Sequence, residues 1–420
     1  MNHPAQPWVA LYPLRLIDKS FELFTLFLLV TLIPWGRAKF LHSLQEYPEA
    51  KCLDGSPAVY YASELSASSH PGLVLYFQAG GWCDPQPQMH PPFHFELCSQ
   101  RAFRDMGSSK LDGDEHWPLL SSYSLLLSQD PLVNPKFHSW QKVFVRYCDG
   151  ASFSGNVAEP VNGLYFKGRK ILDALLEDLV KNRNLAQVQD VIITGCSAGG
   201  LTVFHHCDRI AEFLHQHAPR VKVRCHPDAG FFVDQSSILG PTSNPNVIRE
   251  LYSRAVQFQN SSEGLNSKCL ENNPVSPTEC FFPEVTLPYI ETPCFILNSA
   301  YDSWSIQHIW MTEDGDGITE DPQWKDCVRD LSKCDTDALQ HLQVFYKKTL
   351  DSLEAAEDAS KKHGFWVNSC FRHCQGGNLY RMRDGKTWYD HLVDWYEEKS
   401  FPKISDGIFE HAYCSFNALR

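Results

Sequence analysis

The chain is short of positive charge. Its 37 Lys and Arg residues face 50 Asp and Glu residues, which gives the 420 residues a formal net charge of -13. Such a charge repels polyanions at long range and argues against nucleic acid as the main partner. The 15 cysteines include no Cys-x-x-Cys pair, the unit that structural zinc sites usually need. Their scatter along the chain favours disulfide bonds in an oxidising compartment.

Long apolar runs are also scarce, with one exception near the N-terminus. Residues 23–34 (LFTLFLLVTLIP) carry no charge, and the small residues Gly36 and Ala38 follow. This run is short for a membrane span but fits a secretory signal that is cleaved after Ala38. We therefore expect residues 1–38 to be a signal peptide and the mature chain not to be inserted in a membrane. An uncleaved type II signal anchor is the alternative.

The remainder shows no internal repeat and no linker-like composition, so we expect a single domain over residues 39–420. After residue 70, short apolar runs alternate with amphipathic ones, which is the pattern of parallel strands joined by crossover helices. From about 235 to 290 the sequence is polar and rich in Pro, Asn and Ser, which predicts loops and short helices over the sheet. The expected elements are strands at 73–78, 143–147, 191–194, within 221–232 and at 294–302, and helices at 167–182 and 201–217.

One short motif carries a chemical signature. Residues 195–200 read GCSAGG, between the expected strand at 191–194 and the expected helix at 201–217. They fit the pattern G-x-S-x-G, in which small flanking residues allow a sharp strand-to-helix turn that exposes the serine. The pentapeptide also occurs by chance as a plain Gly-rich turn. Its position between strand and helix favours Ser197 as a nucleophile.

A serine nucleophile needs a histidine to take its proton and a carboxylate to orient the imidazole. In hydrolases with this turn, the acid and then the histidine follow on loops after later strands. Asp302, at the end of the strand expected at 294–302, is the candidate acid. One downstream histidine is too close to Asp302 for a separate loop and two fall in apparent helices, so spacing favours His373 without settling the choice. The histidines in question are His308, His341, His363, His373, His391 and His411.

The oxyanion of such a reaction needs backbone N–H donors, one from the residue after the serine and others from a Gly-rich loop after an earlier strand. Ala198 supplies the first. Gly81 and Trp82 lie in the sequence QAGGWC at 78–83, where the glycines permit unusual backbone angles. Taken alone, this GG pair favours an ordinary tight turn with Trp82 in the core.

Eight stretches of the chain share a wider similarity: CLDGSPAVYY, FQAGGWC, VRYCDGASFSGN, GCSAGGL, DAGFF, CFFPEV, ILNSAYDSW and NSCFRHCQ. They span residues 52–375, and in this order they resemble the pectin acetylesterase family and, more distantly, the carboxylesterase Notum. The resemblance implies an α/β-hydrolase-like fold with a mostly parallel sheet and no need for a metal or organic cofactor. It assigns a triad of Ser197, Asp302 and His373 and oxyanion donors from Gly81, Trp82 and Ala198.

The resemblance also implies an activity. Cys196 before the serine and the sequence HCQ at the base look like the plant-type enzymes, so we expect a secreted or cell-wall serine carboxylesterase. Its partner would be an acetylated polysaccharide such as pectin, or another ester. One alternative is a Notum-like lipid deacylase, which needs a deep apolar pocket beside Ser197. The other is an inactive hydrolase scaffold that serves as a binding module.

The same resemblance suggests how the cysteines pair. An odd total leaves at least one thiol free, and we expect this to be Cys196, packed beneath the turn. The suggested bridges are Cys52–Cys148, Cys83–Cys98, Cys269–Cys280, Cys207–Cys225 and Cys327–Cys334.

Overall fold

A computed structural model describes most of the chain after residue 39. The described residues are 40–63, 72–85, 96–239, 246–312, 319, 321–322, 324–358, 362–379 and 384–410. The leader expected at 1–38 lies outside them, so its cleavage stays a prediction. The described residues belong to one compact unit that begins at Phe40. Among the described helices, none combines the length and the apolar character that a membrane span requires.

A nine-stranded sheet lies at the centre of the described residues, in the order β1-β2-β4-β3-β5-β6-β7-β8-β9. The two strands β1 and β2 pair antiparallel at one edge, and from β4 to β9 all neighbours are parallel. The expected α/β pattern is confirmed, since the five predicted strands correspond to β3, β4, β5, β6 and β7. The strands are β1 (Leu41–Ser43), β2 (Val59–Ala62), β3 (Gly72–Phe77), β4 (Gln141–Val145), β5 (Asp190–Cys196), β6 (Lys222–Asp228), β7 (Phe295–Asp302), β8 (Gly364–Arg372) and β9 (Lys403–Ser405).

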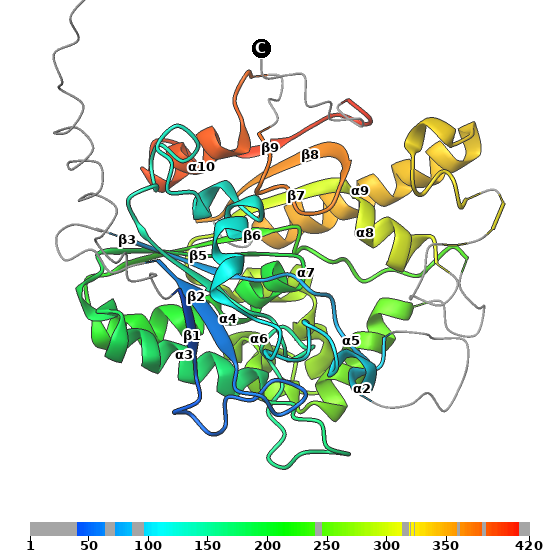
Figure 1. Ribbon diagram of the computed structural model, residues 1–420. Coiled ribbons are helices and arrows are strands. Elements are labelled where there is room, and N and C mark those ends of the chain that lie inside the picture. The colour runs from blue at the N-terminus through cyan, green and yellow to red at the C-terminus, as the bar shows by residue number, and fades with distance from the viewer. Residues whose placement is uncertain are drawn as a thin grey trace, which may run out of the picture. The chain divides into compact units, whose positions relative to one another are not determined.

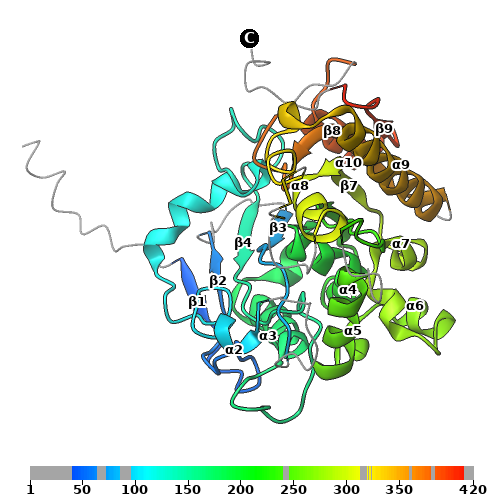
Figure 2. The same ribbon diagram turned by 90° about the vertical axis from the view of Figure 1, so that its right-hand side faces the viewer.

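Helices cover both faces of this sheet (Figure 1, Figure 2). Side chains alternate along a strand, so Leu75 and Phe77 of β3 join the core beneath α3, α4 and α9, while Val74 and Tyr76 join the core beneath α10. The segment after β6 forms loops and the short helices α5 to α7, as expected. The helices are α2 (Cys98–Arg101), α3 (Gly168–Asn182), α4 (Ala198–His217), α5 (Val247–Phe258), α6 (Ser267–Asn272), α7 (Pro283–Thr286), α8 (Ser303–Ser305), α9 (Thr336–Asp358) and α10 (Trp388–Tyr396).

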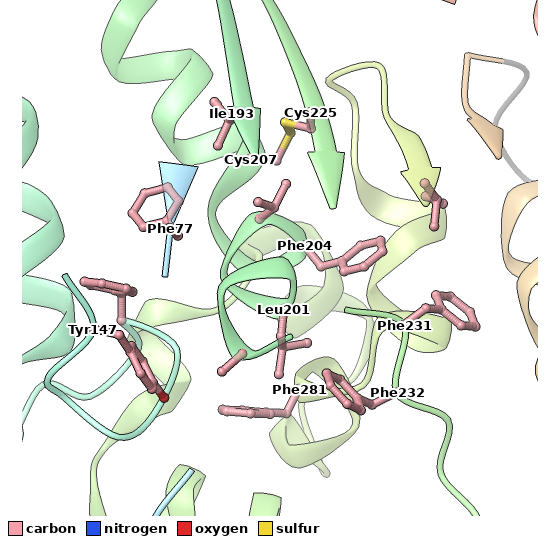
Figure 3. Packing of buried hydrophobic residues seen from close by; sticks show 14 of the residues in the cluster. Phe77, Tyr147, Ile193, Leu201, Phe204, Cys207, Cys225, Phe231, Phe232 and Phe281 are labelled. Carbon is pink, nitrogen blue, oxygen red and sulfur yellow. A yellow bond between two sulfur atoms is a disulfide. The ribbon is translucent and has the colours of Figure 1, made fainter. Parts of the chain in front are cut away.

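Helix α4 begins directly after the GCSAGG turn, and its first ten residues are all buried. Figure 3 shows Leu201 and Phe204 of α4 among Phe231, Phe232 and Phe281, which come from the chain after β6. The start of α4 is therefore held from several sides, and the turn before it has little freedom to move.

Six disulfides join described cysteines. The five suggested pairs are present, but the expectation that Cys196 is free is wrong, because Cys196 is bonded to Cys374. Cys370 is also disulfide-bonded. The free thiol among the described cysteines belongs to the buried Cys294.

Candidate active site

The turn between β5 and α4 has the geometry that the motif predicts. Ser197 adopts φ 59° and ψ -125°, a conformation that is rare for residues with a side chain. The two glycines that follow have no room for a Cβ atom: one on Gly199 would lie 2.1 Å from the Phe77 carbonyl oxygen, and one on Gly200 would lie 2.5 Å from that of Asp228. The neighbouring strand ends therefore demand glycine here. The turn places Ser197 at the carboxyl edge of the sheet.

Asp302 and His373 lie at the same edge, at the ends of β7 and β8. The Asp302 Oδ2 atom is 2.6 Å from Nδ1 of His373, and Asp302 Oδ1 accepts the N–H of Ser305 at 2.7 Å. The other ring nitrogen of His373, Nε2, is buried and has no hydrogen-bond partner among the described residues. A carboxylate that holds Nδ1 in this way leaves Nε2 available to take a proton.

The pKa of His373 reflects two opposing effects. Burial disfavours its charged form, but the charge of Asp302, the hydrogen bond to Asp302 and the charge of Asp228 outweigh this and raise the pKa of His373 above its ordinary value of 6.5. Burial raises the pKa of Asp228 to about 6, although backbone N–H groups partly oppose this. The imidazole is thus a stronger base than an isolated one.

The bridge between Cys196 and Cys374 joins the turn to the histidine loop. It connects residues 178 apart in sequence, with a Cα–Cα distance of 5.7 Å. Cys196 directly precedes Ser197 and Cys374 directly follows His373, so the bridge holds the two residues on adjacent segments, although no hydrogen bond joins Ser197 to Nε2 of His373 among the described residues. A ring nitrogen of His373 lies within 4.8 Å of both sulfur atoms. The expectation of a free Cys196 failed because the loop after β8 folds back across the sheet edge, which local sequence does not reveal.

Asp228, at the end of β6, also holds the loop that carries His373. Its backbone carbonyl accepts the N–H of Ser197 at 2.9 Å. Its carboxylate accepts the N–H of Gln375 at 2.9 Å and that of Gly376 at 2.7 Å. Sequence reasoning missed this residue, and the one signal for it was its position in the stretch DAGFF. Asp228 therefore connects the turn to the segment that follows His373.

The proposed oxyanion donors lie in two segments, the Gly81–Trp82 loop and the start of α4, and Ser152 hydrogen-bonds to both. The indole N–H of Trp82 donates to Oγ of Ser152 at 2.9 Å, and this hydroxyl donates to the Ala198 carbonyl at 2.8 Å. Gly81 adopts a positive φ of 60°. Within the part of the chain that the structure describes, the backbone N–H groups of Gly81, Trp82 and Ala198 find no acceptor. These N–H groups remain available for a ligand with negative charge.

Aromatic rings pack tightly beside His373. The ring centroids of Trp82 and Phe232 are 4.9 Å apart, and those of Phe232 and Trp304 are 5.4 Å apart. Trp304 and Phe232 in turn lie 6.1 Å and 6.2 Å from the imidazole of His373. Phe232 is 1% exposed and Trp82 is 4% exposed. Side chains therefore fill the space between the histidine and the loop that carries Trp82.

The remaining histidine candidates lie elsewhere. His308 stacks on Trp304, and His363 is buried, where it accepts the N–H of Cys294 at 3.1 Å. The predicted helical positions of His341 and His391 are confirmed, since they lie on α9 and α10. His411 lies outside the described residues. Among the described histidines, His373 is the one that is hydrogen-bonded to Asp302.

Two clusters have the spacing of metal ligands but the wrong chemistry. Cys196, His373 and Cys374 form one, and Cys207, Cys225 and Cys294 form the other, with ligand atoms within 4.8 Å of one another. In each cluster two of the sulfur atoms are joined in a disulfide. A cysteine binds a metal ion as the thiolate, which a disulfide sulfur cannot become. Each cluster is therefore left with one usable ligand, and neither fits a metal ion.

Comparisons with known proteins identify the family and the fold. The sequence model of the pectinacetylesterase family matches residues 37–411. Pectin acetylesterase 5 of Arabidopsis thaliana is 33% identical over 377 residues, which cover 87% of this chain and 82% of that protein. The palmitoleoyl-protein carboxylesterase NOTUM of Schmidtea mediterranea is 27% identical over 278 residues, which cover 63% of this chain and 49% of that protein. A solved structure of the Wnt deacylase Notum from Drosophila matches with a TM-score of 0.66 at 19% identity and covers 87% of this chain and 96% of its own. The fold is therefore α/β-hydrolase-like.

Proposed function

Because the chain belongs to the pectinacetylesterase family and is a carboxylic ester hydrolase, we propose that it removes O-acetyl groups from an acetylated polysaccharide such as pectin. The observation that carries the proposal is the hydrogen bond between Asp302 and His373 beside the strained turn at Ser197. The bridge from Cys196 to Cys374 ties these parts together.

The proposed mechanism has two acyl-transfer steps. The Oγ atom of Ser197 attacks the acetyl carbonyl carbon while Nε2 of His373 takes its proton, and Asp302 stabilises the resulting imidazolium through Nδ1. The tetrahedral intermediate collapses as His373 returns the proton to the sugar oxygen, which leaves as the alcohol. Water, activated by the same nitrogen, then attacks the acetyl-enzyme and releases acetate. The oxyanion in each step is stabilised by the N–H groups of Gly81, Trp82 and Ala198.

The packing beside His373 supports a small acyl group. A long acyl chain on Ser197 would need a channel, but Trp82, Phe232 and Trp304 occupy the space beside the base. This favours an acetyl ester over the lipid substrate of a Notum-like deacylase, which is the second candidate. An inactive scaffold is disfavoured because the hydrogen-bonded pair of His373 and Asp302 is complete.

The disulfides support a location outside the cytosol. Six disulfide bonds join the described cysteines, and disulfide bonds form and persist in oxidising compartments. We propose that residues 1–38 direct the chain into the secretory pathway and that residues 39–420 act as one esterase domain, outside the cell or in the cell wall. An uncleaved leader would instead anchor the same domain to a membrane.

A direct assay tests the proposal. Purified protein is given acetylated pectin, acetylated xylan, and the acetate and octanoate esters of 4-nitrophenol, and acetate or nitrophenol release is measured. We expect hydrolysis of pectin and a preference for the acetate ester, with Ser197→Ala slower by several orders of magnitude. Ser276→Ala, at an exposed serine, is the matched control and should keep full activity.

Other outcomes would contradict specific parts of the proposal. Near-normal activity of Ser197→Ala would refute the assigned nucleophile, and a preference for octanoate would favour the lipid deacylase. Because the protein and pectin are both anionic, added salt should raise the rate on pectin and leave the rate on neutral xylan unchanged. The same salt response for both polysaccharides would argue against pectin.

A further inference from the structure

The direction of a backbone N–H is fixed by the carbonyl in the same peptide unit. A peptide unit is planar, so the N–H of Gly81 points opposite to the C=O of Gly80, and the N–H of Trp82 points opposite to the C=O of Gly81. A group that binds either carbonyl therefore aims the N–H of the next residue. The same logic applies to Ala198, where the preceding carbonyl of Ser197 accepts the N–H of Leu201 at 2.8 Å within α4.

Two buried side chains bind the carbonyls of the Gly80–Trp82 loop. The Arg101 guanidinium donates from Nη1 to the Gly80 carbonyl at 2.7 Å and from Nη2 to the Trp82 carbonyl at 3.1 Å. The Tyr147 hydroxyl donates to the Gly81 carbonyl at 2.7 Å. All three carbonyls of the loop are thus held by side chains from other parts of the chain.

Both side chains are themselves held in place. Arg101 is 6% exposed, and its Nε donates to Glu96 at 2.8 Å. The helix that carries it, α2, is tied to the end of the loop by the Cys83–Cys98 disulfide. Tyr147 lies in the core (Figure 3), where its hydroxyl also accepts the N–H of Ser152 at 3.1 Å.

The ring of Tyr147 also packs directly against the loop. A Cβ atom on Gly80 would lie 2.2 Å from Cδ1 of Tyr147, so the close contact is possible only with glycine at this position. The loop can therefore neither rotate its carbonyls nor move away without breaking these contacts.

We propose that Arg101 and Tyr147 are positioning residues that aim the N–H groups of Gly81 and Trp82 at the oxyanion. The inference rests on the function proposed above. A purely structural network would be expected to satisfy both sides of each peptide unit, since unpaired backbone N–H groups cost free energy. Here the carbonyls are bound while, within the described residues, the N–H groups find no acceptor. A reacting ester would supply the missing acceptor.

The test removes the Tyr147 hydroxyl and compares the effect on kcat with that of removing another buried tyrosine hydroxyl. Tyr147→Phe keeps the ring and loses the bond to Gly81. Tyr389→Phe is the control, because the Tyr389 hydroxyl is also buried, donates to Asn134 at 2.7 Å and accepts the N–H of Lys136 at 3.0 Å, away from the site. For 4-nitrophenyl acetate, we expect Tyr147→Phe to lower kcat by about 10-fold or more with KM nearly unchanged. Tyr389→Phe should keep the wild-type kcat.

Arg101→Lys provides a second variant. It keeps the charge but cannot reach two carbonyls as a planar guanidinium does, so we expect kcat to fall there as well. Wild-type kcat in Tyr147→Phe, or an equal loss in Tyr389→Phe, would overturn the inference. Failure of the proposed function looks different: the wild type would then show no hydrolysis that depends on Ser197 and no labelling of Ser197 by a fluorophosphonate.

Discussion

Removal of the Cys196–Cys374 bridge should weaken both stability and catalysis. The double change Cys196→Ala and Cys374→Ala opens a loop of 178 residues. The loss of this constraint on the unfolded chain corresponds to about 5 kcal/mol, a large part of the stability of an ordinary domain. It also releases the loop that carries His373, so kcat for 4-nitrophenyl acetate should fall in protein that is still folded. Urea unfolding followed by tryptophan fluorescence measures the first effect and steady-state kinetics at low temperature measures the second.

The bridge between Cys327 and Cys334 is the natural control. It closes only 7 residues and lies on a different segment of the chain, so its removal should cost about 2 kcal/mol and leave kcat unchanged. Equal losses of stability in the two variants would refute the reasoning from loop length. An unchanged kcat in the variant that lacks the Cys196 bridge would show that the histidine loop is held by its other contacts, those with Asp228 among them.

Three further changes test other parts of the structure. Asp302→Asn should lower kcat by about 10⁴-fold. In the wild type the acid limb of the pH–rate profile should lie above about pH 6.5, because the pKa of His373 is raised, and in the variant it should move to lower pH because the charge of Asp302 is gone. An unshifted limb would exclude His373 as the titrating base. Phe232→Ala opens space beside the base and should raise the ratio of kcat/KM for 4-nitrophenyl butyrate over the acetate by about 10-fold, whereas an unchanged ratio would place the acyl site elsewhere. Burial lowers the pKa of Lys142 from 10.5 to about 7, so the unfolded chain holds this proton between those values and native stability rises with pH there. Lys142→Met should therefore stabilise the fold, with a gain that shrinks by about 2 kcal/mol between about pH 7 and about pH 9, and a gain that does not depend on pH would contradict this.

Much of the fold follows from local patterns in the sequence. The central strands β3 to β7 and the helices α3 and α4 are long, apolar or amphipathic, and their periods are plain. The edge strands β1 and β9 have three residues each and no distinctive pattern, so pairing with a neighbour, not composition, makes them strands. Sequence reasoning accordingly described β3 to β7 and missed two strands on either side, β1 and β2 at one edge of the sheet and β8 and β9 at the other.

The candidate site divides in the same way. The turn at Ser197 and the acid at Asp302 could be predicted from strand order, while the choice of His373 needed the wider resemblance. The contacts that hold the site are long-range: the Cys196–Cys374 bridge and the Asp228 carboxylate both depend on how the loop after β8 returns across the sheet. Such a path leaves no local signal, and the roles of the site residues remain a proposal for the assays above.

The bridge at Cys196 has a practical consequence for anyone who produces the protein. A bacterial cytosol keeps thiols reduced, so a chain made there would fold, if at all, without the covalent link beside Ser197. Low activity of such material would reflect the host and not the enzyme. A periplasmic or eukaryotic secretory host is the appropriate source, and a thiol titration of the unfolded product before any kinetic measurement would show whether its cysteines are oxidised.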